Sequence, residues 1–135
     1  MLIGAAAIAL SLSSCKFLEA KYSKNSAATV AYLKDNKTAP AKSNLEGVWY
    51  SPQWGMIIVN QEAGGKLSGV FQDYYTVDGV ISGNDAYIAL IDDDWTEYTV
   101  KLHRQNSEYW TGYYSSSVPF SEKDQTPLVL KRIDR

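Results

Sequence analysis

Short apolar and alternating stretches, separated by turn residues, recur along the second two thirds of the chain. Val48 to Tyr50 and Met56 to Val59 are too short for helices and are rich in the β-branched, aromatic or apolar residues that half-buried strands prefer. Lys66 to Asp73 has the period-two spacing that places alternate side chains on opposite faces of a strand. Gly64-Gly65, just before it, suits a tight turn with positive φ. The pattern predicts three consecutive antiparallel strands.

The same kind of pattern continues to the end of the chain. Tyr74 to Val77 extends the third strand, and Asp78-Gly79 is a strong hairpin signal. Val80 to Ile91 is strand-like again, with Gly83-Asn84-Asp85 inside it as a turn or a bulge. The later segments are a charged turn at Asp92-Asp93-Asp94, a strand over Trp95 to His103, a turn at Gln105-Asn106-Ser107, a strand over Tyr109 to Ser116, a polar loop to Gln125 and a last strand over Leu128 to Ile133.

Seven or eight short strands at close spacing, with no helical pattern between them, are typical of an all-β sandwich or an up-and-down barrel. A weak internal repeat favours the meander, because similar segments that begin at Leu67, Ile81, Trp95 and Trp110 start 14, 14 and 15 residues apart. Glycine within three of these segments suits the bends that closing a small barrel requires. We therefore expect an all-β fold, a small up-and-down antiparallel meander barrel of seven or eight strands.

The N-terminus has the composition of a targeting segment. Leu2 to Leu12 is apolar, and Leu12-Ser13-Ser14-Cys15 places small residues between a Leu and the only Cys of the chain. This stretch resembles a bacterial lipoprotein signal with its lipobox, and the apolar run is too short to span a membrane as a helix. The resemblance implies cleavage before Cys15 and acylation of that Cys. Each buried CH₂ of the acyl chains then contributes about 0.8 kcal/mol to anchoring.

Three further features bear on this interpretation. Lipoprotein signals are basic before the apolar run, but no Lys or Arg precedes it here. Either the true start of the protein lies further upstream, or the lipobox motif is a chance match. The alternative structure is a buried N-terminal helix that ends at a free Cys.

A single Cys excludes an internal disulfide and a cysteine-based zinc site. By the sorting rule of such lipoproteins, Lys16 after the Cys implies the outer membrane of the cell envelope, on its periplasmic face or at the surface.

The chain is expected to divide into a signal peptide (1–14), a lipid-anchored tether (15–44) and a barrel domain (45–135). The tether is predicted to be flexible and partly helical, with Ser26 as the N-cap of a marginal helix over Ala27 to Leu33. Residues 16–44 hold six Lys and two acids, a charge of +4, while residues 45–135 hold seven basic and thirteen acidic residues, a charge of −6. This distribution favours a tether near an anionic surface and argues against nucleic acid as a partner.

The first three strands resemble the opening of the avidin and streptavidin family, which begins Gly-x-Trp-Tyr and continues through an apolar strand, a Gly turn and Leu-[Ser/Thr]-Gly-x-[Tyr/Phe]. The matching positions are Gly47, Trp49, Tyr50, Ile58, Val59, Gly65, Leu67, Gly69 and Phe71, and Trp110-Thr111-Gly112-Tyr113 is similar to a later Trp-Ser-Gly-x-Tyr strand of that family. Gly47-Val48-Trp49 equally resembles the Gly-x-Trp that opens lipocalins. Both resemblances imply an eight-stranded meander barrel with a ligand cavity and with the strand-1 Trp packed across the barrel floor.

The biotin site of the avidin family does not carry over to this chain. The family holds biotin with several polar side chains, whereas the aligned positions here are Ser51, Gly55 and Phe71. Arg132 stands where the family has an Asp in its C-terminal strand. A site built on buried hydrogen bonds loses most of its discrimination when its polar groups are removed. We therefore expect no tight binding of biotin.

The sequence offers little for catalysis or metal binding. His103 is the only His, and without a nucleophile-elbow motif a Ser-His-Asp triad is a remote alternative to a surface or packing role. Asp92-Asp93-Asp94 is an alternative set of Ca²⁺ ligands, but its spacing is not that of an EF-hand loop, and a solvated hairpin turn is the favoured interpretation. We expect a protein that is not an enzyme and that holds neither metal nor cofactor.

Aromatic residues are the richest set for binding, because the chain holds ten Tyr and four Trp, more than packing needs. Tyr98, Tyr109 and Tyr114 belong to this set. The candidates for ligand or partner contact are Tyr74, Tyr75, Trp95, Trp110, Tyr113, Asp93 and Asp94.

Two functions stay open. The first is a lipid-anchored barrel that binds a small apolar or amphipathic ligand in its cavity. The second is an anchored module that meets an envelope or secreted protein through an aromatic, acidic face, as an inhibitor or immunity-type protein would. Large inward side chains would fill a small barrel and favour the second function, while small ones would favour the first. At the predicted hairpin tip, Asp93 and Asp94 would steer a basic partner that Trp95 anchors, or the acids would only keep the turn solvated.

Overall fold

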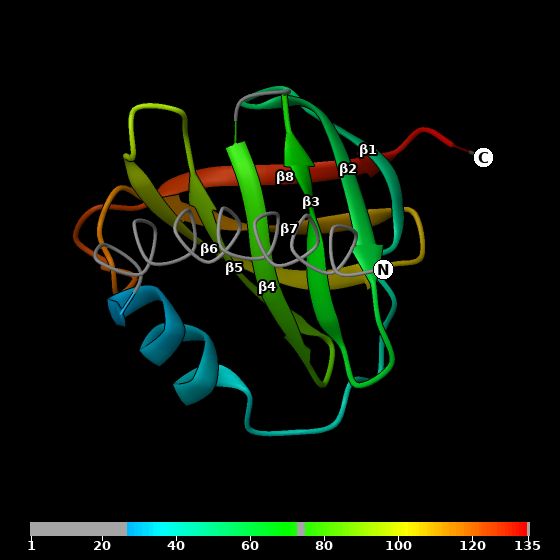
Figure 1. Cartoon of the computed structure of the whole chain (residues 1–135). Helices are drawn as coiled ribbons and strands as arrows, with labels where there is room; N and C mark the ends of the chain where they lie inside the picture. The colour runs from blue at the N-terminus through cyan, green and yellow to red at the C-terminus, as the bar shows by residue number, and fades with distance from the viewer. Residues whose placement is uncertain (1–26, 73–74, 135) are drawn as a thin grey trace, which may run out of the picture.

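A computed structural model describes residues 27–72 and 75–134, which form a closed β-barrel preceded by one helix (Figure 1). The helix covers residues 27–36 of the described chain. The strands are β1 (Gly47–Ser51), β2 (Gly55–Gln61), β3 (Lys66–Phe71), β4 (Tyr75–Ser82), β5 (Asp85–Ile91), β6 (Glu97–Asn106), β7 (Tyr109–Ser115) and β8 (Thr126–Arg132).

Each strand pairs with the next one along the chain, and β8 returns to pair antiparallel with β1. The predicted up-and-down antiparallel meander barrel is confirmed, with eight strands in the described part of the chain. Gly64 and Gly65 in the β2–β3 turn have φ angles of 88° and 91°. The glycine pair therefore supplies the positive φ that the hairpin signal predicted.

One predicted turn is wrong. Asp78-Gly79 lies in the middle of β4, where both residues pair with β3 on one side and with β5 on the other. β3 ends at Phe71 and β4 begins at Tyr75, so Tyr75 to Val77 belongs to β4 and does not extend β3. A Cβ on Gly79 would lie 2.8 Å from the carbonyl oxygen of Tyr87. Glycine at this position therefore permits a close approach of two strands and does not mark a hairpin.

Period-two alternation points one set of side chains from every strand into the barrel. The largest wholly buried side chains, each less than 2% exposed, are Trp49, Trp110, Phe71, Leu45, Ile57, Leu67, Ile81, Ile88, Leu90, Leu128, Leu130 and Val59. In an eight-stranded barrel the interior is just wide enough for side chains to fill. The interior formed by the described residues is therefore packed with large aromatic and aliphatic groups.

Trp49 lies in this core beside Leu45, which precedes β1. The indole Nε1 of Trp49 donates a hydrogen bond of 2.9 Å to the carbonyl oxygen of Leu45. The guanidinium of Arg132 lies over the indole, 4.3 Å from the ring centroid, and its Nη1 donates to the carbonyl oxygen of Glu46 at 2.9 Å. The strand-1 Trp is thus wholly buried, as expected, and a cation from the last strand covers it.

The helix of residues 27–36 packs on the outside of β5 and β6. Its buried side chains are Thr29, Tyr32 and Leu33, at i, i+3 and i+4. The Tyr32 hydroxyl donates a hydrogen bond of 3.0 Å to the carbonyl oxygen of Val100 in β6. The Tyr32 ring meets Tyr87 of β5 edge-on, with the centroids 6.3 Å apart. The long-range bond of the Tyr32 hydroxyl and a small apolar face therefore help to hold the helix on the barrel.

Residues 37–44 also follow the barrel surface. The backbone N–H groups of Thr38 and Ala39 both donate to Ser82 Oγ, at 3.1 Å and 3.0 Å. Ala41 forms a parallel bridge with Gly83, at the turn between β4 and β5. The stretch predicted as a partly helical tether is therefore helical in part, and its described residues lie against the barrel because Ser82 and the β4–β5 turn bind its backbone.

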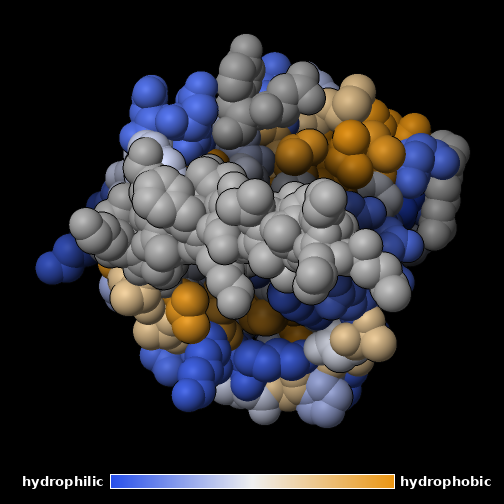
Figure 2. Space-filling model, in the orientation of Figure 1, coloured by the Kyte–Doolittle hydropathy of each residue, from blue (hydrophilic) through white to orange (hydrophobic). Residues whose placement is uncertain are grey.

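The outer faces of β1 to β3 carry exposed apolar side chains. Tyr50, Met56, Ile58 and Val70 are 36% to 53% exposed. The strand register pairs Tyr50 with Met56 and Ile58 with Val70, so the four side chains are neighbours. Figure 2 shows apolar residues gathered at the upper right of the view, over β2 and β3. Patches of a few hundred Å² are common on monomeric proteins, so this one carries no functional assignment by itself.

Replacing Trp49 by Ala is expected to cost about 3–5 kcal/mol of the free energy of unfolding, because it removes a wholly buried indole and the surface on which Arg132 packs. That is a large share of a total of about 5–15 kcal/mol. Urea unfolding and the melting temperature check it. Tyr50→Ala is the matched control, since Tyr50 is the next residue and points outward. Equal melting temperatures for wild type and Trp49→Ala would contradict the buried position.

Stability at alkaline pH should depend on Tyr32. Burial, and secondly the neighbouring Tyr87, raises the pKa of the Tyr32 hydroxyl above its ordinary value. The unfolded chain releases this proton near pH 10, whereas the folded chain retains it. The stabilisation is therefore complete below about pH 10 and is lost as the pH rises toward the folded pKa. Above about pH 10 the wild type should lose up to about 1.4 kcal/mol more per pH unit than Tyr32→Phe.

Urea unfolding of both proteins from pH 7 to pH 11 measures this difference. At pH 7, Tyr32→Phe should be less stable by about 1 kcal/mol, because it lacks the hydrogen bond to Val100. The gap between the two proteins should then narrow as the pH rises. Parallel curves over the whole range would show that Tyr32 titrates normally in the folded protein.

Candidate functional site

The barrel has a mouth at the end where β1, β3, β5 and β7 terminate, and the described residues of the connections there are 52–54, 72, 92–96 and 116–125. In a meander these connections lie at one end. Figure 1 shows the β5–β6 connection at the top of the view and the β2–β3 and β4–β5 connections at the bottom. The β7–β8 connection leans on the outer face of β6, where Thr99 Oγ1 donates a 2.7 Å hydrogen bond to the carbonyl oxygen of Ser117.

Trp54, in the β1–β2 turn, is the centre of an aromatic cluster at this mouth. The centroid of its ring lies 4.5 Å from Tyr75, 5.1 Å from Tyr114, 5.5 Å from Tyr98 and 5.9 Å from Phe71. Each of these four rings makes an angle of 76° to 89° with the indole plane. Edge-to-face packing of this kind is favourable and fixes the position of the indole.

Ser51, the last residue of β1, organises the turn that carries Trp54. Its hydroxyl oxygen accepts the backbone N–H groups of Gln53 at 3.2 Å and of Trp54 at 3.3 Å. Ser51 is wholly buried, so these two contacts replace its hydration. Gly55 then adopts a φ of 71° and leads the chain into β2. A Ser turn followed by Gly therefore directs a large aromatic side chain back over the mouth of the barrel.

The cluster lines a cup of about 510 Å³. The lining residues are Gln53, Trp54, Gly55, Gln72, Tyr75, Tyr98 and Tyr114. Phe71 is wholly buried next to this cluster. The lining combines aromatic rings with two amides and three phenol hydroxyls, and of the described residues that line it none is ionised at neutral pH. Such a surface suits a group with an apolar body and polar atoms at its tip.

The β5–β6 connection places acids beside the cup. Asp92 Oδ1 accepts the backbone N–H groups of Asp94 at 3.0 Å and of Thr96 at 2.8 Å, so Asp92 builds the turn. Asp93 and Asp94 point their carboxylates into solvent. Burial, then Tyr98, Asp92 and Asp93, raises the pKa of the Tyr75 hydroxyl above its ordinary value. The acids are therefore close enough to the cup to change its electrostatics.

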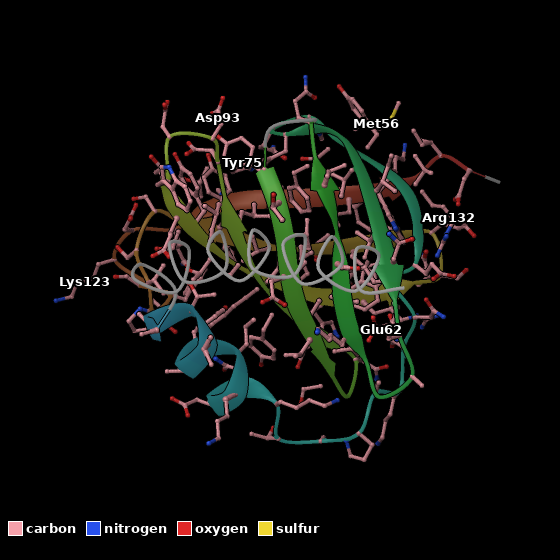
Figure 3. All side chains as sticks on the ribbon, viewed as in Figure 1. Met56, Glu62, Tyr75, Asp93, Lys123 and Arg132 are labelled. Carbon is pink, nitrogen blue, oxygen red and sulfur yellow. The ribbon has the colours of Figure 1, made fainter. Side chains whose placement is uncertain are left out.

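Several of the sequence-predicted residues meet at this mouth and others do not. Tyr75 lines the cup and Asp93 lies beside it, as the labels in Figure 3 show. Asp94 and Trp95 belong to the same connection, where Trp95 has a φ of 67° and precedes the start of β6 at Glu97. Tyr74 and Cys15 lie outside the described residues. The site thus combines the β1–β2 turn, which carries Trp54, with the β5–β6 connection, which carries the acids.

Trp110 and Tyr113 are not part of the mouth. Trp110, a candidate for ligand or partner contact, is wholly buried in the core, because alternation along β7 turns its side chain inward. Tyr113 is 43% exposed on the outer face of the same strand. In the Trp-Thr-Gly-Tyr segment, the Trp therefore packs in the core and the Tyr lies on the outside of the barrel.

Three residues of the cup are not among the candidates for ligand or partner contact that the sequence suggested: Trp54, Tyr98 and Tyr114. Tyr98 and Tyr114 belong to the aromatic set of the sequence, but nothing in the pattern distinguishes them from the core aromatics. Trp54 had a local signal, because a large aromatic residue between Pro52 and Gly55 has no strand neighbours to pack against. A Trp in a tight turn points either into solvent or back over the barrel.

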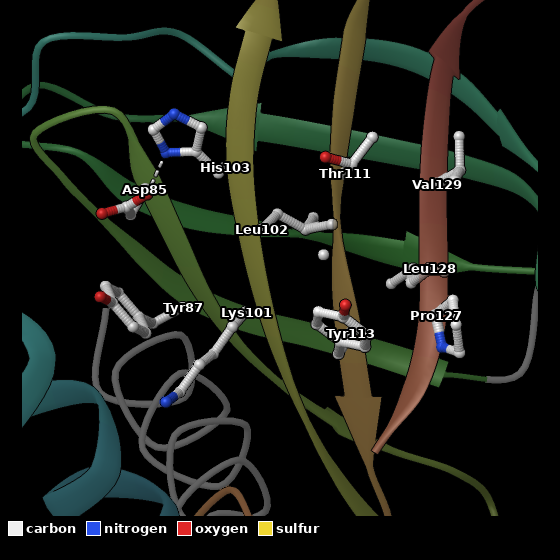
Figure 4. A pocket seen from close by; sticks show the side chains of 11 residues that line it. Asp85, Tyr87, Lys101, Leu102, His103, Thr111, Tyr113, Pro127, Leu128 and Val129 are labelled. Carbon is white, nitrogen blue, oxygen red and sulfur yellow. Dashed lines mark hydrogen bonds and ion pairs between the residues drawn. The ribbon is translucent and has the colours of Figure 1, made fainter. Parts of the chain in front are cut away.

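A second hollow of about 510 Å³ lies on the outer face of β5 to β8 (Figure 4). His103 Nδ1 lies 2.6 Å from Asp85 Oδ1 at one edge of this hollow. Both side chains are largely exposed, so this is a surface hydrogen bond of small energetic value. Leu128 and Gly112 form part of the floor. The lone His thus has a surface partner, and we assign it no catalytic role.

No protein-family model, no curated protein and no solved structure matches this chain. Within residues 27–72 and 75–134 no group of three or more His, Cys, Asp or Glu side chains is placed to hold a metal ion. In the same ranges no helix is long and apolar enough to cross a membrane.

Proposed function

We propose that this protein is a lipid-anchored lipoprotein of the bacterial cell envelope whose barrel mouth binds another protein without catalysing a reaction, as an inhibitor or immunity-type protein does. The observation that carries the proposal is the aromatic cup around Trp54, which stands above a filled barrel and beside the acidic β5–β6 connection. Aromatic anchors with flanking acids are the elements that steer and hold a protein partner.

The filled interior favours a protein partner over a ligand inside the barrel. Trp49, Phe71 and Trp110 are wholly buried and occupy the space in which a small molecule would lie. A partner at the mouth then contacts the loops and inserts at most one group into the cup. Interfaces of this kind concentrate their binding energy in a few aromatic contacts surrounded by polar residues.

A small amphipathic ligand in the cup is the second candidate function. The volume of about 510 Å³ is typical of small-molecule sites. The specific observation in its favour is the Trp54 indole Nε1, which is buried and has no hydrogen-bond partner among the described residues. A ligand oxygen would satisfy that donor. Biotin is not the expected ligand, because Gly55 and the buried Phe71 offer no polar side-chain atom.

The envelope location rests on the N-terminal segment. The lipobox at Leu12 to Cys15 supports acylation of Cys15, and Lys16 supports sorting to the outer membrane. A Cys that carries several acyl chains is a strong anchor, since one chain alone holds a protein only marginally. Anchoring keeps the mouth near the membrane, where an envelope or secreted protein would meet it.

Cys15→Ser should release the protein from membranes, because the acyl chains are its only proposed attachment. Membrane fractionation of the native host compares the variant with the wild type, and mass spectrometry determines the mature N-terminus. The wild type should sediment with membranes and begin at an acylated Cys15. An intact Met1 in material from the native host would refute the assignment.

The mouth is tested with a partner captured from envelope extract on immobilised protein. Replacing Asp93 and Asp94 together by Ala should slow association about tenfold at low salt, and added salt should slow the wild type similarly. Trp95→Ala should mainly speed dissociation, because an aromatic anchor acts after encounter. Surface plasmon resonance separates the two rates.

Tyr113→Ala is the matched control, because Tyr113 is an exposed aromatic residue away from the mouth. A partner that binds all these variants as it binds the wild type would show that the working surface lies elsewhere. Native mass spectrometry of the protein purified from its host tests the second candidate function, since a small ligand adds a defined mass that Trp54→Ala should abolish.

A further inference from the structure

The chemistry of the cup indicates which group a partner inserts. The aromatic side chains that line the cup are Trp54, Tyr75, Tyr98 and Tyr114, and none of the described residues that line it is basic. Aromatic rings carry negative charge density on their faces and attract cations within about 6 Å of the ring centroid. The cup therefore offers a cation several rings and no competing positive charge.

The spacing of the rings lets one cation contact several of them. The centroids of Tyr75, Tyr98 and Tyr114 all lie 4.5–5.5 Å from that of Trp54. Tyr75 and Tyr98 are also neighbours, at 5.6 Å. A group that touches the indole consequently lies beside the phenol rings as well. The side-chain oxygens of Gln53 and Gln72 in the same lining can accept hydrogen bonds from a cationic N–H.

Carboxylates of the β5–β6 connection lie beside the cup and supply the complementary field. That connection holds Asp92, Asp93 and Asp94 and no basic residue, whereas Glu122 and Asp124 belong to the β7–β8 connection on either side of Lys123, which Figure 3 shows far from Tyr75. Asp92 is bonded within its own turn, whereas Asp93 and Asp94 are exposed. Asp124 bonds to Ser116 within the β7–β8 connection. The two exposed aspartates are thus available to a ligand that sits in the cup.

We propose that the cup binds the side chain of an Arg or Lys presented by a basic protein partner. This inference rests on the proposed function, in which the mouth is the binding surface. A partner's side chain is the occupant that the proposed function implies, because the barrel below is filled and a protein partner can reach only the mouth. Arg is favoured over Lys, since its planar guanidinium stacks on aromatic faces and donates several hydrogen bonds in one plane.

The tripeptide Gly-Arg-Gly, with blocked ends, probes the cup directly. Its matched control is Gly-citrulline-Gly, in which a neutral urea of almost the same shape replaces the guanidinium. Two-dimensional NMR follows the indole N–H signals, and the signal absent from Trp54→Phe identifies Trp54. The Arg peptide should shift the Trp54 signal saturably at low ionic strength. The citrulline peptide should bind at least about fivefold more weakly.

Two protein variants test where the cation sits. Asp93→Asn and Glu62→Gln each remove one negative charge, but Figure 3 shows Asp93 at the mouth and Glu62 at the opposite end of the barrel. Asp93→Asn should weaken binding of the Arg peptide about threefold to fivefold, and Glu62→Gln should leave it unchanged. Equal losses for both variants would show a diffuse effect of net charge and would overturn the inference.

Other outcomes also decide the question. Equal shifts from the Arg and citrulline peptides would overturn the cationic chemistry. A shift from tetramethylammonium as large as that from the Arg peptide would assign the cup to a small quaternary cation in place of a partner's side chain. If the captured partner still needs Asp93, Asp94 and Trp95 while the Arg peptide fails to bind, the proposed function stands and this inference falls. If the peptide binds but the captured partner binds the mouth variants as tightly as the wild type, the proposed function is wrong.

Discussion

The closure of the barrel between its first and last strands is the constraint on which the rest of the structure depends. All other strand pairs join neighbours along the chain, whereas β1 and β8 meet across the whole domain, through pairs such as Trp49 with Arg132. Bringing such distant segments together costs chain entropy before any contact forms. The closure therefore needs strong local interactions at the seam.

Arg132 supplies those interactions. Its side chain is 5% exposed, and a buried guanidinium is costly unless its donors are satisfied. Nε donates to the carbonyl oxygen of Ser107 at 3.1 Å, and Nη1 donates to that of Glu46 at 2.9 Å. Asp134 Oδ1 lies 3.3 Å from Nη1 and adds the opposite charge. One side chain thus ties β8 to the β6–β7 turn and to the segment before β1, while it covers Trp49.

A closed and filled barrel leaves its ends and outer faces for function. One end is occupied by Leu45, Trp49 and the Arg132 network, whose polar groups are already paired. The other end has the cup around Trp54, where ring faces, amides and phenols are still accessible. The same packing that stabilises the core therefore leaves the rim, and not the interior, for the recognition that we propose. The helix of residues 27–36 lies on β5 and β6, and eleven residues of sequence (16–26) separate it from Cys15, the proposed site of acylation.

The sequence by itself determined the fold class and the strand alternation, because period-two spacing and short apolar runs are local properties. The burial of Trp49 was implied by the resemblance of the first strands to known meander barrels. The sequence wrongly predicted a turn at Asp78-Gly79, where glycine in fact allows close strand contact. The local preference of a residue does not reveal which strands lie beside it. Only the tertiary structure brought Trp54, Tyr75, Tyr98 and Tyr114 together from four segments, and only it separated the buried Trp110 from the exposed Tyr113. A site of this kind depends on barrel closure and strand register, which no single segment encodes.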